Sequence, residues 1–367
     1  MRILKYKLGD QRGVVFIVVS IALGVLLAFA ALALDAGNLM VVKNELYNVS
    51  DAAALAATRQ LGYIYQDMPY EDQQNYNASA DAATIIAVAQ QVGASNKVAG
   101  STGVTINASD VEIGRWDDPD NPSRLVFDAT FSRPDAVRVK ARKDGSANGP
   151  LATFFARIFG RNTIDVSAKA TAALTGQSTT EAGGLPVPVA ISKAWVEGGA
   201  AFGFCNQPVR FYPTNDPSSC AGWNVYNRYG TLSDDNLRTT IADLQSGAYE
   251  SPATTAYETE YEFGGGTMST PTFAAMLSLF EANRNRDLNN DGEPDAWEAG
   301  IPVYESSDCS NPSGRIMIVG FATIVITGVQ NAPTKQIDGY VVCNNVESGR
   351  GSGHNYGTKG SIPGLVQ

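Results

Sequence analysis

Residues 14–34 read VVFIVVSIALGVLLAFAALAL and carry no charged side chain over 21 positions. As an α-helix with a rise of about 1.5 Å per residue, this stretch would span ~31 Å, enough to cross the hydrocarbon core of a bilayer. The mean hydropathy of the whole chain is −0.11, so the sequence does not indicate a protein with many membrane spans. We therefore predict one transmembrane helix over residues 14–34, preceded by a short basic segment over residues 1–13.

The charges on either side of this helix predict its orientation. Asp35 follows it, and four basic residues precede it: Arg2, Lys5, Lys7 and Arg12. Lys and Arg are in excess on the cytoplasmic flanks of membrane helices. Residues 1–13 are therefore expected in the cytoplasm, and the body of the chain on the other side of the membrane.

A cleavable signal peptide is the alternative interpretation of the same segment. The basic start and the triplet Ala31-Leu32-Ala33 resemble the corresponding parts of a signal peptide. The apolar core of a signal peptide usually covers about 7–15 residues, and this run is longer. We therefore expect the helix to be retained as an anchor.

The overall charge and the histidine content exclude several function classes. The chain has 27 Lys and Arg against 37 Asp and Glu, a net charge of −10. Nucleic-acid binding needs basic surface that displaces counterions, so we expect no nucleic-acid partner. One histidine, His354, cannot supply a His-centred metal site or a well-placed catalytic base, and the sequence has no G-x-S-x-G nucleophile motif. We predict that the protein is not an enzyme.

Beyond the anchor, residues 35–62 have the pattern of an amphipathic helix. The Ala-rich run over residues 52–57 favours helix, and Gly62 is a plausible stop. Apolar residues recur at spacings of three and four: Leu39, Val42, Leu46, Val49, Ala53 and Ala56. We predict a stalk helix that continues the membrane helix; two helices with a bend near Gly37 are the alternative.

Residues 63–175 alternate between helical and strand patterns and predict an α+β domain. A tyrosine-rich loop over residues 62–78 precedes a helix over residues 79–92. Alternating residues then predict strands at 125–131, 136–143 and 164–174, and an apolar stripe predicts a helix at 151–159. Residues 176–184, GQSTTEAGG, have the composition of a linker.

Residues 185–346 are rich in Gly, Pro and Tyr and predict a β-rich domain. Strands are expected at 315–327 and 337–342, and helices at 234–244 and 271–285. Residues 347–367 are rich in Gly and Ser and are expected to form a flexible tail that contains His354.

The cysteines are consistent with a location outside the cytoplasm. All four lie far beyond the anchor, and their spacing has no C-x-x-C metal or redox pattern: Cys205, Cys220, Cys309 and Cys343. An even number in an exported segment predicts two disulfides. Four cysteines allow three connectivities; we favour 205–220 with 309–343 because both loops are local. A reactive catalytic cysteine is the weaker alternative.

Residues 287–298, DLNNDGEPDAWE, form the most specific chemical motif. Oxygen donors occupy loop positions 1, 3, 5, 9 and 12, with Gly292 at position 6 and the Glu293 carbonyl at position 7. This spacing predicts a calcium site. Pro294, Gly300 and Pro302 favour a structural site over a regulatory one, and an exposed acidic turn is the alternative. The predicted ligands are Asp287, Asn289, Asp291, Glu293, Asp295 and Glu298.

Three motifs near the anchor resemble a known family. Arg12-Gly13-Val14-Val15 precedes the apolar run, Leu34-Asp35-Ala36-Gly37 follows it, and the run DAAALAA occupies residues 51–57. They resemble the N-terminus of TadG-like proteins of the bacterial tight-adherence (Flp) pilus-assembly systems. Residues 111–175 are similar to the periplasmic segment of that family, through Gly114-Arg115-Trp116 and the run SAKATAA. The resemblance covers most of residues 12–175.

The resemblance implies a single-pass protein of the bacterial inner membrane, with its body periplasmic or extracellular and with other pilus-assembly or pilin subunits as partners. The residue patterns described above predict an α+β fold: a transmembrane helix that continues as an amphipathic helix, a pilin-like α+β domain and then the β-rich, disulfide-bonded domain. We expect a non-enzymatic assembly factor or minor pilin-like subunit stabilised by calcium. A stalk-displayed adhesin whose tyrosines contact a surface ligand is the alternative.

Overall fold

The computed structural model describes residues 12–117, 125–197, 204–210, 220–264 and 268–366 of the chain. These residues divide into two compact units that share several elements. Unit 1 comprises Met1–Ala53, Ala89–Val111 and Val139–Ala170, and unit 2 comprises Ala54–Val88, Glu112–Arg138 and Thr171–Gln367.

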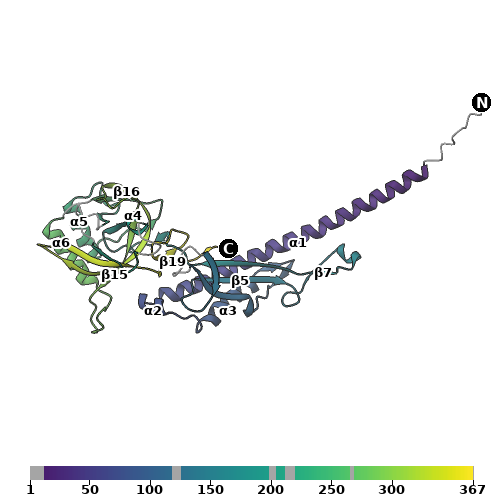
Figure 1. Cartoon of the computed structure of the whole chain (residues 1–367), viewed down its shortest axis with the longest axis horizontal. Helices are drawn as coiled ribbons and strands as arrows, with labels where there is room; N and C mark the ends of the chain where they lie inside the picture. The colour runs from purple at the N-terminus through teal and green to yellow at the C-terminus, as the bar shows by residue number, and fades with distance from the viewer. Residues whose placement is uncertain (1–11, 118–124, 198–203, 211–219, 265–267, 367) are drawn as a thin grey trace, which may run out of the picture. The chain divides into compact units, whose positions relative to one another are not determined.

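The N-terminal element is α1, Arg12–Gln66, one unbroken helix of 55 residues (Figure 1). The predicted membrane helix and stalk helix are thus a single helix, and the alternative with a bend near Gly37 is wrong. Gly62 does not end the helix either. A Cβ at Gly62 would lie 2.1 Å from the carbonyl oxygen of Ser361, so this glycine permits close approach of another backbone segment.

In unit 1, the second part of α1 packs on strands through a narrow apolar face. Val42, Leu46 and Val49 are buried at spacings of four and three, as predicted. The buried Ser50 hydroxyl donates to the carbonyl of Ala168 at 3.1 Å and accepts from the amide of Ala141 at 3.1 Å. These bonds tie α1 to two strands, β5 (Ala136–Lys143) and β8 (Val166–Ala173). The other elements of unit 1 are the end of α3 (Ala82–Ala94), β1 (Lys97–Val98), β2 (Ser101–Thr102), η1 (Ala108–Asp110), β6 (Leu151–Ala152), η2 (Ala156–Phe159) and β7 (Thr163–Ile164).

The predicted helix over residues 151–159 is wrong. The structure instead has the short pair β6–β7, closed by a turn and by the single 3₁₀ turn η2. Of the apolar stripe that predicted this helix, Leu151 is buried and the other four residues are exposed: Phe154, Phe155, Ile158 and Phe159. Backbone amides that an α-helix would leave at its start are bound here by the carboxylate of Asp35, 119 or more residues earlier in the chain.

A five-stranded sheet in the order β20-β8-β5-β3-β4 runs through the middle of the chain. Its strands are β3 (Val111–Asp117), β4 (Leu125–Ala129), β5 (Ala136–Lys143), β8 (Val166–Ala173) and β20 (Gly364–Leu365). The alternating patterns at 125–131, 136–143 and 164–174 therefore predicted strands correctly. The predicted loop at 62–78 contains the end of α1 and a short helix, α2 (Tyr70–Asn75).

The C-terminal part of unit 2 is β-rich, as predicted. Its seven-stranded sheet has the order β11-β17-β16-β14-β12-β10-β15, and β15 also pairs with β16. Five of these strands therefore close into a ring. The strands are β10 (Val189–Ser192), β11 (Pro208–Arg210), β12 (Ala221–Asn224), β14 (Glu260–Gly264), β15 (Trp297–Tyr304), β16 (Gly314–Gln330) and β17 (Gln336–Val342).

Large apolar side chains fill this barrel and the space under its helices. Trp223 and Phe273 are almost fully buried in the same core cluster, with ring centroids 5.7 Å apart. The helices α5 (Asp234–Ser246) and α6 (Thr270–Asn283) begin with serine caps, because Ser233 and Ser269 accept from backbone amides of the first turn. A short helix, α4 (Lys193–Glu197), follows β10. The α+β fold class predicted from the sequence is confirmed.

The expectation of a flexible tail over residues 347–367 is wrong for the described residues up to 366. Here β18 (Asn345–Arg350) pairs in parallel with β19 (Thr358–Ile362), and β20 pairs with β8. The predicted linker over 176–184 contains β9 (Thr179–Thr180), which pairs with β13 (Thr254–Thr255). A Cβ at Gly176 would lie 2.4 Å from the carbonyl oxygen of His354, so the glycines allow tight backbone packing rather than flexibility.

The cysteines form two disulfides, as predicted, but the favoured pairing of 205–220 with 309–343 is wrong. Cys205 bonds Cys343, with their Cα atoms 5.6 Å apart, and Cys220 bonds Cys309, with their Cα atoms 4.3 Å apart. The sheet explains this choice. Strand β11, just after Cys205, pairs with β17, which ends beside Cys343. The buried Ser192 links the two segments that the Cys220–Cys309 bond joins. Its amide donates to the Cys220 carbonyl, and its hydroxyl donates to the Asp308 carbonyl next to Cys309.

Candidate functional site

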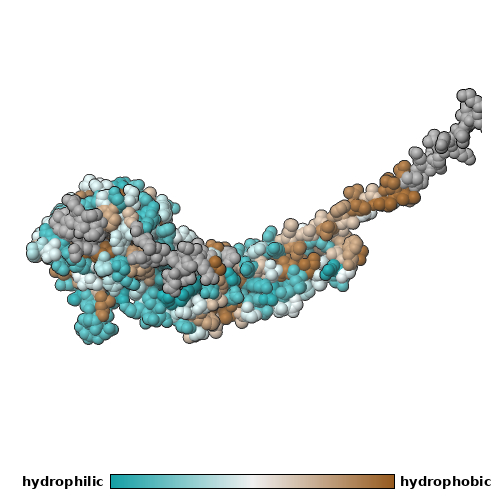
Figure 2. Space-filling model, in the orientation of Figure 1, coloured by the Kyte–Doolittle hydropathy of each residue, from teal (hydrophilic) through white to brown (hydrophobic). Residues whose placement is uncertain are grey.

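The first candidate site is the exposed apolar half of α1. Its most apolar 18-residue window has a mean hydropathy of 2.9, and none of that window is buried. Figure 2 shows this part of the helix as a continuous hydrophobic surface. A soluble surface helix would turn such side chains toward a core. By length and composition, this one helix of the described chain can cross a membrane.

A carboxylate marks the end of this apolar run. The Asp35 side chain is 8% exposed and accepts from the amides of Phe154, Phe155 and Ala156 at 2.8, 3.0 and 2.7 Å. Burial raises the pKa of this carboxyl, but the three amides and the nearby Arg157 lower it, and the net pKa lies below the ordinary value. Asp35 is therefore an ionised, backbone-bound residue at the first turn beyond the apolar run.

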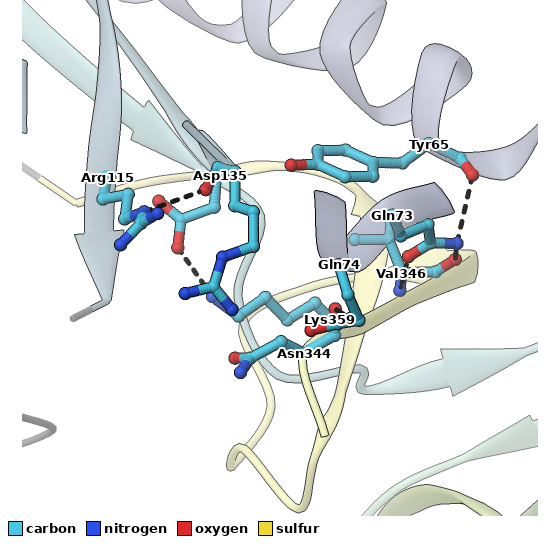
Figure 3. A pocket seen from close by; sticks show the side chains of 9 residues that line it. Tyr65, Gln73, Gln74, Arg115, Asp135, Asn344, Val346 and Lys359 are labelled. Atoms are coloured by element: carbon cyan, nitrogen blue, oxygen red, sulfur yellow. Dashed lines mark hydrogen bonds and ion pairs between the residues drawn. The ribbon is translucent and has the colours of Figure 1, made fainter. Parts of the chain in front are cut away.

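The second candidate site is a small polar cavity in unit 2, drawn in Figure 3. The Lys359 ammonium on β19 lies 2.6 Å from a carboxylate oxygen of Asp135, and both side chains are buried. The other carboxylate oxygen accepts from the Trp116 amide at 2.6 Å. The space that remains is about 30 Å³, which is room for one water molecule.

Glutamine side chains close the other wall of this cavity. Gln73 on α2 is 4% exposed; its amide oxygen accepts from the Val346 backbone at 2.8 Å, and its amide nitrogen donates to the carbonyls of Tyr65, Met68 and Val346. Tyr65 lies on α1, Met68 follows its end, and Val346 lies on β18, as Figure 3 shows for Tyr65 and Val346. Because Asp135 pairs with Lys359 and Gln73 bonds the backbone of separate segments, these side chains hold the C-terminal strands against α1 and the sheet. The space that remains is too small for a substrate.

The structure places the predicted calcium ligands on an exposed loop between α6 and β15. Asp287 accepts from the Gly292 amide at 2.7 Å, Asn289 from the Asp291 amide at 2.9 Å, and Asp291 from the Glu293 amide at 2.9 Å. Loop positions 1, 3 and 5 thus turn inward. In the described parts of the chain, no three or more His, Cys, Asp or Glu side chains are grouped as a metal site.

Of the other three predicted ligands, Glu293 is exposed, Asp295 bonds within the loop, and Glu298 is engaged outside it. Asp295 accepts from the Leu288 amide at 2.9 Å. Glu298, at the start of β15, lies 2.8 Å from the Arg286 guanidinium, which also pairs with Glu71 of α2. Burial raises the pKa of Glu298, and the Arg286 charge lowers it, with a net increase. Glu298 is therefore part of an ion-pair group beside α2.

Glu347 on β18 lies beside this group and is the most strongly perturbed of its carboxyls. Burial, and then the charge of Glu298, raise the pKa of Glu347 from the ordinary 4.5 to about 7, although a hydrogen bond from Asn345 acts in the opposite direction. Between pH 4.5 and about pH 7, Glu347 is protonated in the folded chain but ionised in the unfolded chain. Folding stability should therefore fall as the pH rises from about 4.5 to about 7.

This pH dependence can be removed by one substitution. Glu347→Gln is expected to flatten the change in the free energy of unfolding between these pH values, and to stabilise the chain at pH 8 by about 3 kcal/mol. Urea unfolding of the full chain in detergent at pH 5 and pH 8 measures it. Glu250→Gln, an exposed glutamate, is the matched control. An unchanged pH dependence in Glu347→Gln would show that another group causes it.

Several of these residues could not be found from sequence patterns. Asp135 precedes a strand and Lys359 lies in a Gly-rich segment, and neither is part of a recognisable motif. Gln73 lies in a stretch predicted to be a loop. Asp35 was identified as a flanking charge, while its role in binding the amides of residues 154–156 depends on a contact across more than one hundred residues.

These features define a class: an α+β protein tied to a long, exposed apolar N-terminal helix and extended by a disulfide-bonded β-rich region. Residues 13–60 match the putative Flp pilus-assembly TadE/G-like family, and residues 69–172 match the putative Tad-like Flp pilus-assembly family. These matches cover the N-terminal and middle regions of the chain, confirm the resemblance there, and support a Tad-pilus-associated protein. No curated protein and no solved structure matches the chain.

Proposed function

We propose that the protein is a membrane-anchored, extracytoplasmic component of a Tad-type pilus, acting as an assembly factor or a minor pilin-like subunit. The observation that carries the proposal is α1: one rigid helix whose first half exposes every side chain from Val15 to Ala30 and whose second half is built into the Tad-like region. Lipid or neighbouring apolar helices must cover that first half in the cell.

The proposed orientation places the N-terminus in the cytoplasm. It rests on the basic residues before the apolar run and on the two disulfides beyond it. Disulfides persist in oxidising compartments such as the periplasm. The proposed role is non-enzymatic, because the single histidine, His354, is exposed and lies beside Tyr356, with ring centroids 4.7 Å apart.

Membrane fractionation and co-purification test this function together. The full chain, tagged at its C-terminus and expressed at native level, is expected to stay in the membrane after alkaline extraction and to co-purify with pilin or Tad assembly proteins. A mature chain that begins near Leu34 in the soluble fraction would instead support the signal-peptide interpretation. Retention in the membrane without any pilus protein would contradict the proposed role but not the anchor.

We also propose that residues 287–295 bind calcium as a structural staple. The donors are the side chains of Asp287, Asn289, Asp291 and Asp295 and the Glu293 carbonyl, a hard oxygen set of the kind that calcium prefers. The tight turn at Gly292, with a φ of 94°, supports this proposal. Glu298 is expected to remain with Arg286 rather than to complete the shell. When bound, the ion would offset the repulsion between the loop's carboxylates.

Calcium is therefore expected to stabilise the full chain. At about 100 times its Kd, calcium should add roughly 3 kcal/mol to the free energy of unfolding and raise the Tm. Asp291→Ala should abolish this increase, and Glu258→Ala, an exposed glutamate elsewhere in unit 2, should preserve it. Thermal unfolding with calcium or with EDTA measures the effect. The same Tm under both conditions would contradict the calcium site.

A further inference from the structure

We propose that the turn between β6 and β7, residues 153–162, is a membrane-docking loop that inserts into the lipid interface beside α1. The inference rests on the proposed anchor and goes beyond it, because it assigns the lipid contact to a part of the chain far from the membrane helix in sequence. Both segments belong to unit 1.

The first observation is the exposure of large apolar side chains on this loop. Phe154, Ile158 and Phe159 are 59%, 74% and 79% exposed, and Phe155 is 37% exposed. Four neighbouring exposed side chains of this size are unusual on a protein surrounded by water, where such patches mark an interaction surface. Figure 2 shows the hydrophobic patch at the end of the unit where Figure 1 labels β7.

The second observation is the position of the loop along α1. The three amides that bind Asp35 belong to the loop itself, so its backbone is fixed at the residue that ends the uncharged run. The exposed apolar surface of α1 continues beyond Asp35 to Met40 and Val41, which are 67% and 57% exposed, and polar side chains follow at Lys43 and Asn44. At about 1.5 Å per residue, Val41 lies ~9 Å beyond Asp35, so the loop is fixed where α1 still exposes apolar side chains.

The third observation is the charge and rigidity of the loop. Residues 151–164 contain two exposed arginines, Arg157 and Arg161, and no acidic residue. Phenylalanine and isoleucine beside arginine is the composition of segments that lie in the headgroup region, where guanidinium groups meet lipid phosphates. The turn is closed by its own bonds, with the Arg161 amide donating to Ala156 and the Gly160 amide to Arg157. The conformation of the loop is therefore held by its own hydrogen bonds and does not depend on the membrane.

The occupant that these observations favour is the bilayer rather than another protein. The patch is fixed at Asp35, next to the exposed apolar surface of α1 that the proposed anchor places in lipid, and its basic charge complements anionic headgroups. The loop would fix the depth and rotation of α1 in the membrane, because Asp35 joins the two. A pilus subunit seated on the same patch is the competing outcome of the test.

A fluorescent probe on the loop can separate these outcomes. The full chain carrying Ile158→Cys, labelled with an environment-sensitive nitrobenzoxadiazole, is reconstituted into phosphatidylcholine vesicles with or without phosphatidylglycerol. Its native cysteines are in disulfides and do not react. The matched control is Ser101→Cys, an exposed position of unit 1 in β2, whose neighbour Ala99 contacts Glu45, ten residues beyond Asp35 on α1.

The loop probe is expected to emit at shorter wavelength and to be quenched roughly two- to threefold more strongly by headgroup-region spin-labelled lipid than the control. If phosphatidylglycerol increases the quenching of the loop probe, the double variant Arg157→Gln/Arg161→Gln should reduce that increase. A loop probe that behaves like the control in vesicles overturns the inference; if it is shielded only in native membranes that hold pilus proteins, the patch binds protein. Failure of the full chain to float with vesicles would overturn the anchor as well, whereas a floating chain with a water-exposed loop overturns this inference alone.

Discussion

Replacing Lys359 by methionine is expected to lower the free energy of unfolding by about 3–5 kcal/mol, because it removes the partner of a buried charge. The Lys359 ammonium lies 2.6 Å from the Asp135 carboxylate, and both side chains are buried. Without the lysine, Asp135 must either stay ionised in the interior or take up a proton. Chemical unfolding of the full chain in detergent measures the loss.

Two further variants make this prediction specific. Lys193→Met removes the same type of side chain from a surface pair with Glu305 at 3.0 Å, and should cost no more than about 1 kcal/mol. The double variant Asp135→Asn/Lys359→Met should lose less than the sum of the two single variants, because neither charge remains alone. Equal losses for Lys359→Met and Lys193→Met would contradict the structural role of the buried pair.

Removing the disulfide between Cys205 and Cys343 is expected to have the second large effect. The bond joins residues 138 positions apart, so it restricts the unfolded chain strongly, and a loss of about 2–5 kcal/mol is expected for Cys205→Ser/Cys343→Ser. The measurement is unfolding of the full chain without reductant. Cys220→Ser/Cys309→Ser removes the other bond, which encloses a loop of 89 residues, and should give a loss of similar size.

The alternative connectivities make different predictions for the same proteins. Peptide mapping of the non-reduced chain should show fragments 205 and 343 joined, and 220 and 309 joined. In the pairing between close neighbours that the sequence favoured, Cys205→Ser/Cys343→Ser would break both bonds and leave Cys220 and Cys309 as free thiols. Free thiols in that variant would contradict the pairing described here.

Elements whose patterns are local could be predicted from the sequence. The uncharged run and the three- and four-residue spacing after it predicted α1, and simple alternation predicted β5 and β8, because each strand has one face on the core. Glycine composition led to two wrong predictions. Gly62 looked like a helix end, and residues 347–367 looked flexible, because the close backbone contacts that require these glycines are made with segments far away in sequence.

The candidate sites depended even more on distant contacts. The apolar stripe at 151–159 has helical spacing, but its amides are bound by Asp35 and its phenylalanines are exposed, so periodicity predicted a buried helix where the chain forms a turn. The pair of Asp135 and Lys359 joins residues 224 positions apart. In contrast, the calcium prediction used only neighbouring residues, and it stays a prediction that the thermal-unfolding experiment tests.

We propose that α1 holds this protein in the membrane as part of a Tad-type pilus system. In-cell photo-crosslinking from the exposed position Leu26, in the middle of the apolar run, tests it most directly. A photoreactive phenylalanine analogue at this position, in an otherwise native chain, is expected to give adducts with lipid and with a pilin or Tad assembly protein of the same membrane. The absence of any pilus-protein adduct, together with recovery of the chain in the soluble fraction, would contradict the account.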